Sequence, residues 1–185
     1  MKKLGFLKNN LCLINIFIIL ILYLKIPPIL GNEDLFLKIG IQSIKNKRAP
    51  NFSLRDLNGN VVEFKNFKGK LIFLTFWATW CGPCKKEMPS LEALYQQFKY
   101  KDFSIVSIAL DYEKSSSVKE FIKKNGYTFP VLVDPKNHTV DLFQVKGIPT
   151  TILIDKQGMI IGKAMGPREW NKPEVISLIN ILLEK

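Results

Sequence analysis

Two cysteines separated by two residues, Cys81 and Cys84, are the side chains of this sequence best suited to chemistry. They follow an apolar run that ends at Trp77 and begin a stretch of helical periodicity that continues to about Lys99. Unpaired N–H groups and the helix dipole favour an anion at a helix start, and therefore favour the thiolate of Cys81. Cys84 lies nearly one turn later, within reach of a mixed disulfide formed on Cys81. The pair predicts thiol–disulfide exchange, with Cys81 as nucleophile and Cys84 as resolving thiol.

The residues beside the two cysteines suit the approach of another chain. Pro83 fits the first helical turn, where its missing N–H removes no hydrogen bond. Gly82 leaves the space beside the sulfur atoms clear. Trp80, directly before the nucleophile, is expected to shape the docking surface. We predict that all three contact the substrate.

A structural metal site is the main competing interpretation of such a cysteine pair. A closed zinc site needs two further soft ligands, but the sequence has only one other cysteine, Cys12, and one histidine, His138. We therefore expect no metal and no other cofactor. A purely structural disulfide is also a weak interpretation, because so short a loop constrains little of the unfolded chain.

Strands and helices alternate on both sides of the pair. A hairpin is predicted around Asn58-Gly59, because these turn residues separate two segments of strand character. Residues 71–77 and 103–110 have the composition of buried strands, residues 151–164 predict a second hairpin, and residues 173–184 a closing helix. The expected fold class is α/β, with helices packed on a mixed sheet.

The segment from Phe76 to Pro89, FWATWCGPCKKEMP, resembles the active-site segment of the thioredoxin superfamily. More narrowly, it resembles the membrane-anchored TlpA/ResA-like thiol–disulfide oxidoreductases of bacteria. A second motif, Gly147-Ile148-Pro149-Thr150, precedes a predicted strand and strengthens the resemblance. The likeness implies a thioredoxin-like fold with a mixed central β-sheet flanked by helices. It also implies an N-terminal β-hairpin and a central insertion over residues 115–133.

The resemblance also assigns site residues. It implies a redox disulfide between Cys81 and Cys84 and a cis peptide bond before Pro149, close to that disulfide. The backbone of Ile148 would then be free to pair with a substrate strand. Ile148 and Pro149 are therefore added to the expected substrate-binding residues.

The proton carrier differs from that of plain thioredoxins. Those proteins carry a buried aspartate at the position of Thr75, and a threonine cannot act as a general base. TlpA/ResA-like members have a glutamate three residues after the second cysteine, which is Glu87 here. Two interpretations of Glu87 stay open: proton transfer at Cys84, or a solvated charge among neighbouring lysines.

The N-terminal residues indicate export from the cytoplasm. Lys2, Lys3 and Lys8 precede an uncharged apolar run, the pattern of an export signal whose start stays in the cytoplasm. Residues 1–31 are predicted to be a signal-anchor, with a cleaved signal peptide as the alternative. Residues 32–47 are predicted to be a linker and residues 48–185 the thioredoxin-like domain. This organisation implies the periplasmic side of a bacterial cell envelope and attachment to the inner membrane through the N-terminal segment.

Charge and motif together limit the expected partners. The formal net charge is +11, but the lysines are scattered and form neither a basic helix nor an aromatic stacking platform, so nucleic acid is not an expected partner. The Gly-Pro dipeptide between the cysteines resembles that of thioredoxin, whose potential lies near −270 mV, which favours a dithiol reductant. By resemblance, its targets are oxidised cysteine-containing envelope proteins, namely apocytochromes c or copper-handling oxidase-assembly proteins. A membrane electron donor would re-reduce it.

Two other functions remain as alternatives. A copper-binding module would use the two thiolates together with His138, provided that the fold brings them together. A thiol peroxidase of the same superfamily would carry its cysteine in a Pro-x-x-x-Thr-x-x-Cys pattern, which does not match at Cys81.

Overall fold

The structure is a computed structural model that describes residues 32–111 and 115–185. The predicted anchor or signal peptide at residues 1–31 lies outside these ranges. Within them, none of the helices has the length and apolar character needed to cross a membrane. The described residues from Asn32 to Lys185 belong to one compact unit.

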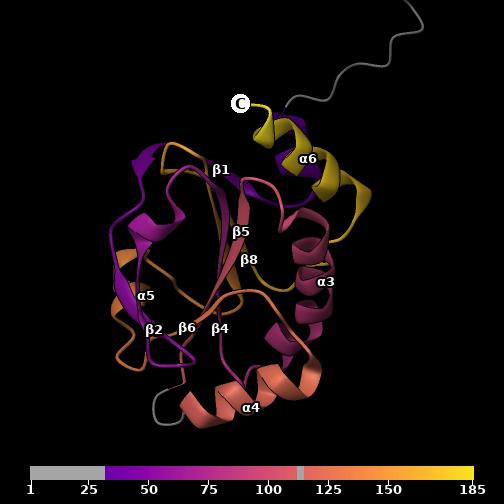
Figure 1. The fold of residues 1–185 in the computed structure, drawn as a ribbon. Helices are drawn as coiled ribbons and strands as arrows, with labels where there is room; N and C mark the ends of the chain where they lie inside the picture. The colour runs from indigo at the N-terminus through magenta and orange to yellow at the C-terminus, as the bar shows by residue number, and fades with distance from the viewer. Residues whose placement is uncertain (1–31, 112–114) are drawn as a thin grey trace, which may run out of the picture. The chain divides into compact units, whose positions relative to one another are not determined.

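Helices and strands alternate along this unit (Figure 1). The strands are β1 (Gln42–Arg48), β2 (Ser53–Asp56), β3 (Val61–Glu63), β4 (Leu71–Trp77), β5 (Phe103–Ala109), β6 (Val131–Val133), β7 (Thr150–Ile154) and β8 (Met159–Met165). The helices are α2 (Asn32–Lys38), η1 (a 3-10 turn, Phe64–Phe67), α3 (Gly82–Phe98), α4 (Ser115–Asn125), α5 (His138–Leu142) and α6 (Pro173–Leu183).

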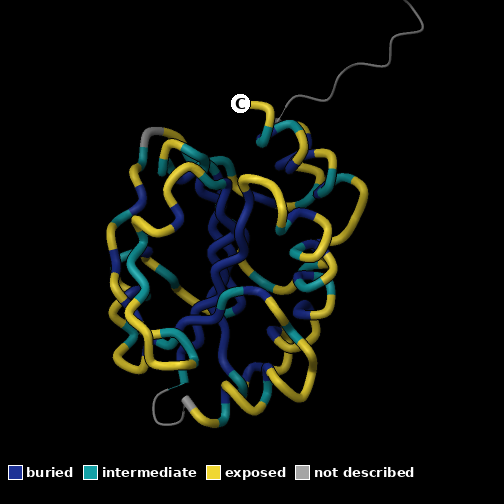
Figure 2. Tube along the Cα trace, viewed as in Figure 1, coloured by how far each residue is buried: buried dark blue, intermediate teal, exposed yellow. Residues whose placement is uncertain are grey.

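The strands form one mixed sheet in the order β1-β8-β7-β4-β5-β6-β2-β3. Strand β4 pairs in parallel with β5 and antiparallel with β7, and β5 continues in parallel to β6. All seven residues of β4 and of β5 are buried, and they form the dark centre of the tube in Figure 2. This arrangement confirms the predicted thioredoxin-like α/β fold. Strands buried on both faces have near-continuous apolar sequences, which explains why these two are recognisable from sequence.

The two faces of the sheet carry separate apolar clusters. One cluster packs α2, α3, α4 and α6 against the sheet, and the other packs α5 and η1 against the opposite face. Cys81 and Cys84 belong to the first cluster. The predicted hairpin and central insertion are joined, since β6 of the insertion pairs with β2 of the hairpin.

Residues 32–47 differ from the predicted linker. They form α2 and most of β1, so the compact unit begins at Asn32 instead of residue 48. Leu35, Phe36 and Ile41 are each only 4% exposed. β1 pairs with β8, where a Cβ added at Gly162 would lie 2.6 Å from the Ile41 side chain. A seven-residue helix shows too little periodicity to be recognised by pattern, and this one is stabilised by tertiary contacts.

Candidate active site

The turn between β4 and α3 places the first cysteine at the start of the helix. Cys81 is the N-cap of α3, and its Sγ accepts the backbone N–H of Cys84 at 3.2 Å. Pro83 occupies the first turn of the helix, where no N–H is needed. The sulfur of Cys81 therefore receives the hydrogen bond and the dipole field that stabilise a thiolate.

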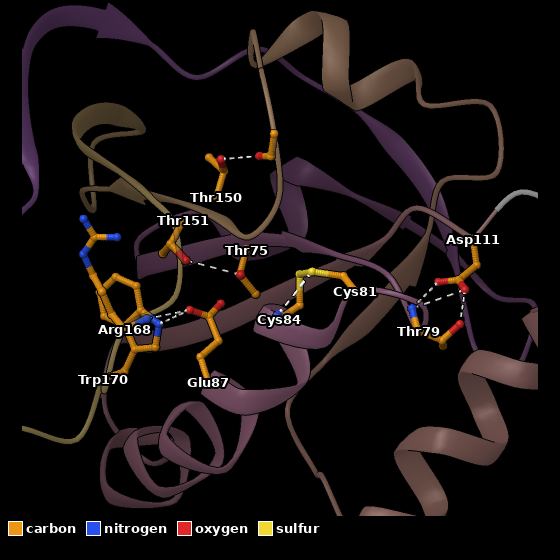
Figure 3. The surroundings of a disulfide bond; sticks show 11 residues. Thr75, Thr79, Cys81, Cys84, Glu87, Asp111, Thr150, Thr151, Arg168 and Trp170 are labelled. Carbon is orange, nitrogen blue, oxygen red and sulfur yellow. Dashed lines mark hydrogen bonds between the residues drawn. A yellow bond between two sulfur atoms is a disulfide. The ribbon is translucent and has the colours of Figure 1, made fainter.

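Cys81 and Cys84 are joined by a disulfide with Cα atoms 5.3 Å apart (Figure 3). The predicted disulfide between these two cysteines is thus present. Both residues are largely buried, Cys81 being 5% and Cys84 1% exposed. The three neighbours predicted to contact substrate are exposed: Gly82 and Pro83 lie on the first helical turn, and Trp80 is 66% exposed. A Cβ added at Gly82 would meet no atom within 4 Å, so the surface beside the disulfide is open.

The loop before β7 contains the expected cis peptide bond, between Ile148 and Pro149. Two hydrogen bonds hold this loop: the Thr150 hydroxyl donates to the Gly147 carbonyl at 2.6 Å, and the Gly166 N–H donates to the Pro149 carbonyl at 2.8 Å. Ile148 is half-buried and Pro149 is buried.

Glu87 is buried, at 3% exposed, so the interpretation as a solvated surface charge is wrong. Its Oε2 accepts the backbone N–H of Arg168 at 3.1 Å and the indole N–H of Trp170 at 3.3 Å. Burial raises the pKa of the Glu87 carboxyl to about 7, although both hydrogen bonds and the Arg168 charge oppose the rise. Figure 3 shows Glu87 between the disulfide and the Arg168–Trp170 pair. A carboxyl with this pKa can both accept and release a proton near neutral pH.

Thr75 occupies the position where thioredoxins carry an aspartate. It is 1% exposed, and its hydroxyl oxygen accepts a hydrogen bond of 3.2 Å from the Thr151 hydroxyl (Figure 3). The two hydroxyls, on adjacent strands, are both neutral, so this position supplies no titrating group. Glu87 is the buried carboxyl on the same helix as the cysteines.

Asp111 is a residue of the site that sequence reasoning missed. Its carboxylate accepts the backbone N–H of Thr79 at 3.1 Å and also the Thr79 hydroxyl, which fixes the turn two residues before Cys81. A sequence signal existed: Asp111 follows the end of β5, and parallel neighbours such as β4 and β5 end at the same edge of the sheet. Arg168 and Trp170 had no such signal, because they reach Glu87 from a loop more than 80 residues away.

His138 does not lie on the helical layer of the cysteines. It begins α5, which packs on the opposite face of the sheet from α3. In the described ranges, no group of three or more His, Cys, Asp or Glu side chains is placed to hold a metal ion.

Comparison with known proteins agrees with this geometry. A profile of the AhpC/TSA family matches residues 46–163, more than half of the chain. The chain belongs to the AhpC/TSA family. Within this family, it is 42% identical over 120 residues to the thiol-disulfide oxidoreductase ResA of Bacillus cereus (strain ZK / E33L), covering 65% of this chain and 69% of that protein. Against ResA of Bacillus subtilis (strain 168), the identity is 41% over 118 residues, covering 64% and 65%.

Solved structures show the same fold. The crystal structure of a protein assigned as the thiol:disulfide interchange protein DsbE from Chlorobium tepidum superposes with a TM-score of 0.69 at 34% identity, covering 77% of this chain and 99% of that one. StoA from Bacillus subtilis superposes with a TM-score of 0.60 at 28% identity, covering 70% and 97%. This member of the AhpC/TSA family is therefore a thiol-disulfide oxidoreductase with a thioredoxin-like fold, and it carries a Cys81–Cys84 disulfide.

Proposed function

We propose that this protein is a dithiol reductant of protein disulfides in the bacterial cell envelope. The observation that carries the proposal is the Cys81–Cys84 disulfide at the start of α3, preceded by exposed Trp80. The cis peptide bond before Pro149 supports it, because this bond lies in the loop leading into β7, the strand that pairs with β4. The Gly-Pro dipeptide between the cysteines supports the reducing direction, by its likeness to thioredoxin.

The proposed reaction has two exchange steps. In the first, the Cys81 thiolate attacks one sulfur of the target disulfide, so that a mixed disulfide forms and the other target sulfur leaves as a thiolate. In the second, Cys84 loses its proton and attacks Cys81 Sγ, which releases the second target sulfur and forms the Cys81–Cys84 disulfide. Two electrons pass to the target, and the two target thiolates take up protons.

Glu87 is proposed to accept the proton of Cys84 in the second step. Three residues along a helix place the two side chains on the same side of α3, and the pKa of about 7 leaves the Glu87 carboxylate partly ionised at neutral pH. Trp80, Gly82, Pro83, Ile148 and Pro149 are proposed to form the surface that holds the substrate.

The cellular setting is part of the same proposal. The basic and then apolar pattern of residues 1–31 supports membrane attachment with the domain outside the cytoplasm. After Cys12, the only cysteines are the redox pair, so folding in an oxidising compartment requires no further disulfide. We propose that apocytochromes c or copper-handling oxidase-assembly proteins are the targets, and that a membrane-bound dithiol donor re-reduces the pair.

The experiment that tests this function traps the mixed disulfide. In a Cys84→Ser variant the nucleophile and the docking surface remain, but nothing releases the target, so covalent adducts that dissolve in reductant should accumulate in the native envelope. The Cys81→Ser, Cys84→Ser double variant is the control and should form none. An apocytochrome c adduct supports the maturation role, and a copper-assembly protein adduct supports the oxidase role. Absence of reducible adducts, or adducts that persist without Cys81, would overturn the proposal.

A further inference from the structure

The side chain of Arg168 joins two separate segments of backbone. Its Nε and Nη2 donate to the carbonyls of Ile39 and Gly40, in the turn between α2 and β1, at 3.1 and 2.6 Å. Its Nη1 donates to the carbonyls of Met165 and Gly166, at the end of β8, at 2.7 and 2.8 Å. A guanidinium shared among four carbonyls of two segments fixes the position of one segment relative to the other.

The loop that follows β8, which Arg168 connects to the α2–β1 turn, also binds the carboxylate of Glu87. The backbone N–H of Arg168 donates to the Glu87 carboxylate. Ser90 binds the same loop to α3, because its hydroxyl accepts the backbone N–H of Trp170 at 3.0 Å and donates to the backbone carbonyl of Glu87 at 2.7 Å. The loop between β8 and α6 is therefore positioned by Arg168 on one side and by α3 on the other.

We propose that Arg168 is a positioning residue for proton transfer at Glu87, and that the α2–β1 turn controls this step through it. The proposal rests on the proposed role of Glu87 as proton acceptor for Cys84. It adds that residues 32–41, which precede β1, form part of the machinery that sets the acidity of the active site.

We call the side-chain hydrogen bonds of Arg168 to the two segments the Arg168 clamp. This clamp should affect the pKa of Glu87. Burial raises the pKa of Glu87, whereas the backbone hydrogen bond and the positive charge of Arg168 lower it. Glu87 opens onto a cavity of about 600 Å³ whose other charged lining residues are Lys38, Lys86, Glu169, Lys172 and Glu174. Lys38 pairs with Glu174 at 3.1 Å and Lys172 with Glu169 at 3.3 Å, so four of these five charges compensate each other. Loss of the clamp should therefore weaken the two Arg168 contributions that oppose burial, leave the Trp170 hydrogen bond as the remaining opposing interaction, and raise the pKa of Glu87.

The α2–β1 turn offers a second way to disturb the clamp without touching Arg168. Gly40 has φ +69°, and a Cβ added there would lie 3.1 Å from Arg168 Nη2. Gly40→Ala would therefore strain the turn and push against the guanidinium. Gly126 is a matched control, because it also has φ +69° but a Cβ added there would meet no atom within 4 Å. The two variants carry a similar backbone cost, and only the first disturbs Arg168.

The test separates the two exchange steps in the purified, reduced full chain carrying Cys12→Ser, which removes the third thiol of the sequence. Dithionitrobenzoate releases one coloured thiolate when Cys81 attacks it and a second when Cys84 resolves the mixed disulfide, so stopped-flow absorbance follows each step across pH. With Glu87 as proton acceptor, the rate of the second step should rise with pH when Arg168, Gly40 and Glu87 are unchanged. The midpoint of this rise should lie at about pH 7. In Arg168→Gln and Gly40→Ala this midpoint should move up by about one pH unit, which slows the second step about fivefold at pH 7. Arg168→Lys should shift it less, and Gly126→Ala should leave it unchanged.

A Glu87→Gln background distinguishes positioning from general destabilisation. If Arg168 acts through Glu87, adding Arg168→Gln to Glu87→Gln should produce no further change in the pH profile of the second step. An unshifted midpoint in both Arg168→Gln and Gly40→Ala would overturn the proposal, as would a shift that persists in the Glu87→Gln background. Neither result bears on the disulfide-trapping experiment, which depends on Cys81 and not on Glu87.

Discussion

The indole N–H of Trp170 donates a hydrogen bond of 3.3 Å to the carboxylate of Glu87, joining residues that are 83 positions apart. Trp170 is fully buried and packs edge-on against Phe73 of the central strand β4. The carboxylate is therefore held by the core of the protein although it belongs to the helix of the redox cysteines. The ionisation of Glu87 should therefore affect the stability of the fold as well as the proposed proton transfer.

Replacing Glu87 with Gln should make the protein more stable above neutral pH. The folded-state pKa of about 7 lies above the reference value of 4.5, so the folded state binds a proton more tightly than the unfolded state. The stability that this proton contributes is full below pH 4.5 and is lost as pH rises toward 7, by about 3 kcal/mol. Glu87→Gln removes the loss, because a neutral amide keeps an oxygen for the Arg168 and Trp170 donors.

Urea denaturation at pH 4.5 and pH 8 measures this difference. The unmodified protein should lose stability between the two pH values relative to Glu87→Gln, and the two proteins should converge at the lower pH. Parallel stability curves across this range would show that Glu87 does not titrate with a raised pKa.

Replacing Thr75 with Val should lower stability without changing the exchange reaction. The variant keeps the shape of the side chain but removes the acceptor of the Thr151 hydroxyl in a fully buried position, at a cost of about 1 kcal/mol. Thermal unfolding measures the loss, and the two dithionitrobenzoate steps measure the chemistry. A changed pH profile of the second step would mean that the Thr75–Thr151 pair takes part in proton transfer.

Replacing Trp80 with Ala should raise the KM for protein disulfides more than the KM for small disulfides. Trp80 is 66% exposed, so its removal should change stability by less than about 0.5 kcal/mol. An aromatic anchor in an interface contributes more than about 1 kcal/mol, which corresponds to at least fivefold in KM for a protein disulfide. Tyr100→Ala is the matched control, since Tyr100 is 91% exposed at the far end of α3. Equal effects of the two variants would remove Trp80 from the docking surface.

The two thiols of the reduced protein should differ in their rate of alkylation. Cys81 stands at the N-cap, where the sulfur accepts a backbone N–H, whereas Cys84 lies inside the first turn at 1% exposed. We expect iodoacetamide to label Cys81 about tenfold faster or more. Peptide mass mapping resolves the two sites and separates both from Cys12. Comparable rates would contradict the assignment of Cys81 as nucleophile.

The sequence alone was enough to predict the disulfide between Cys81 and Cys84 and the fold that carries it. A cysteine pair between a buried strand and a helix is a local pattern, and so is the Gly-Ile-Pro-Thr motif before β7. The paired central strands are recognisable because burial on both faces demands continuous apolar residues. The resemblance to TlpA/ResA-like proteins placed Glu87 among the candidates, but left its environment open.

Only the tertiary structure decided what surrounds these residues. The sequence predicted a linker over residues 32–47, but these residues form α2 and most of β1. Their few apolar side chains are buried by α6 and β8, which lie far along the chain. The tertiary structure placed Asp111 against Thr79 and brought Arg168 and Trp170 to Glu87. The acidity of Glu87 could not be read from the sequence, because it depends on burial and on donors that no local pattern encodes.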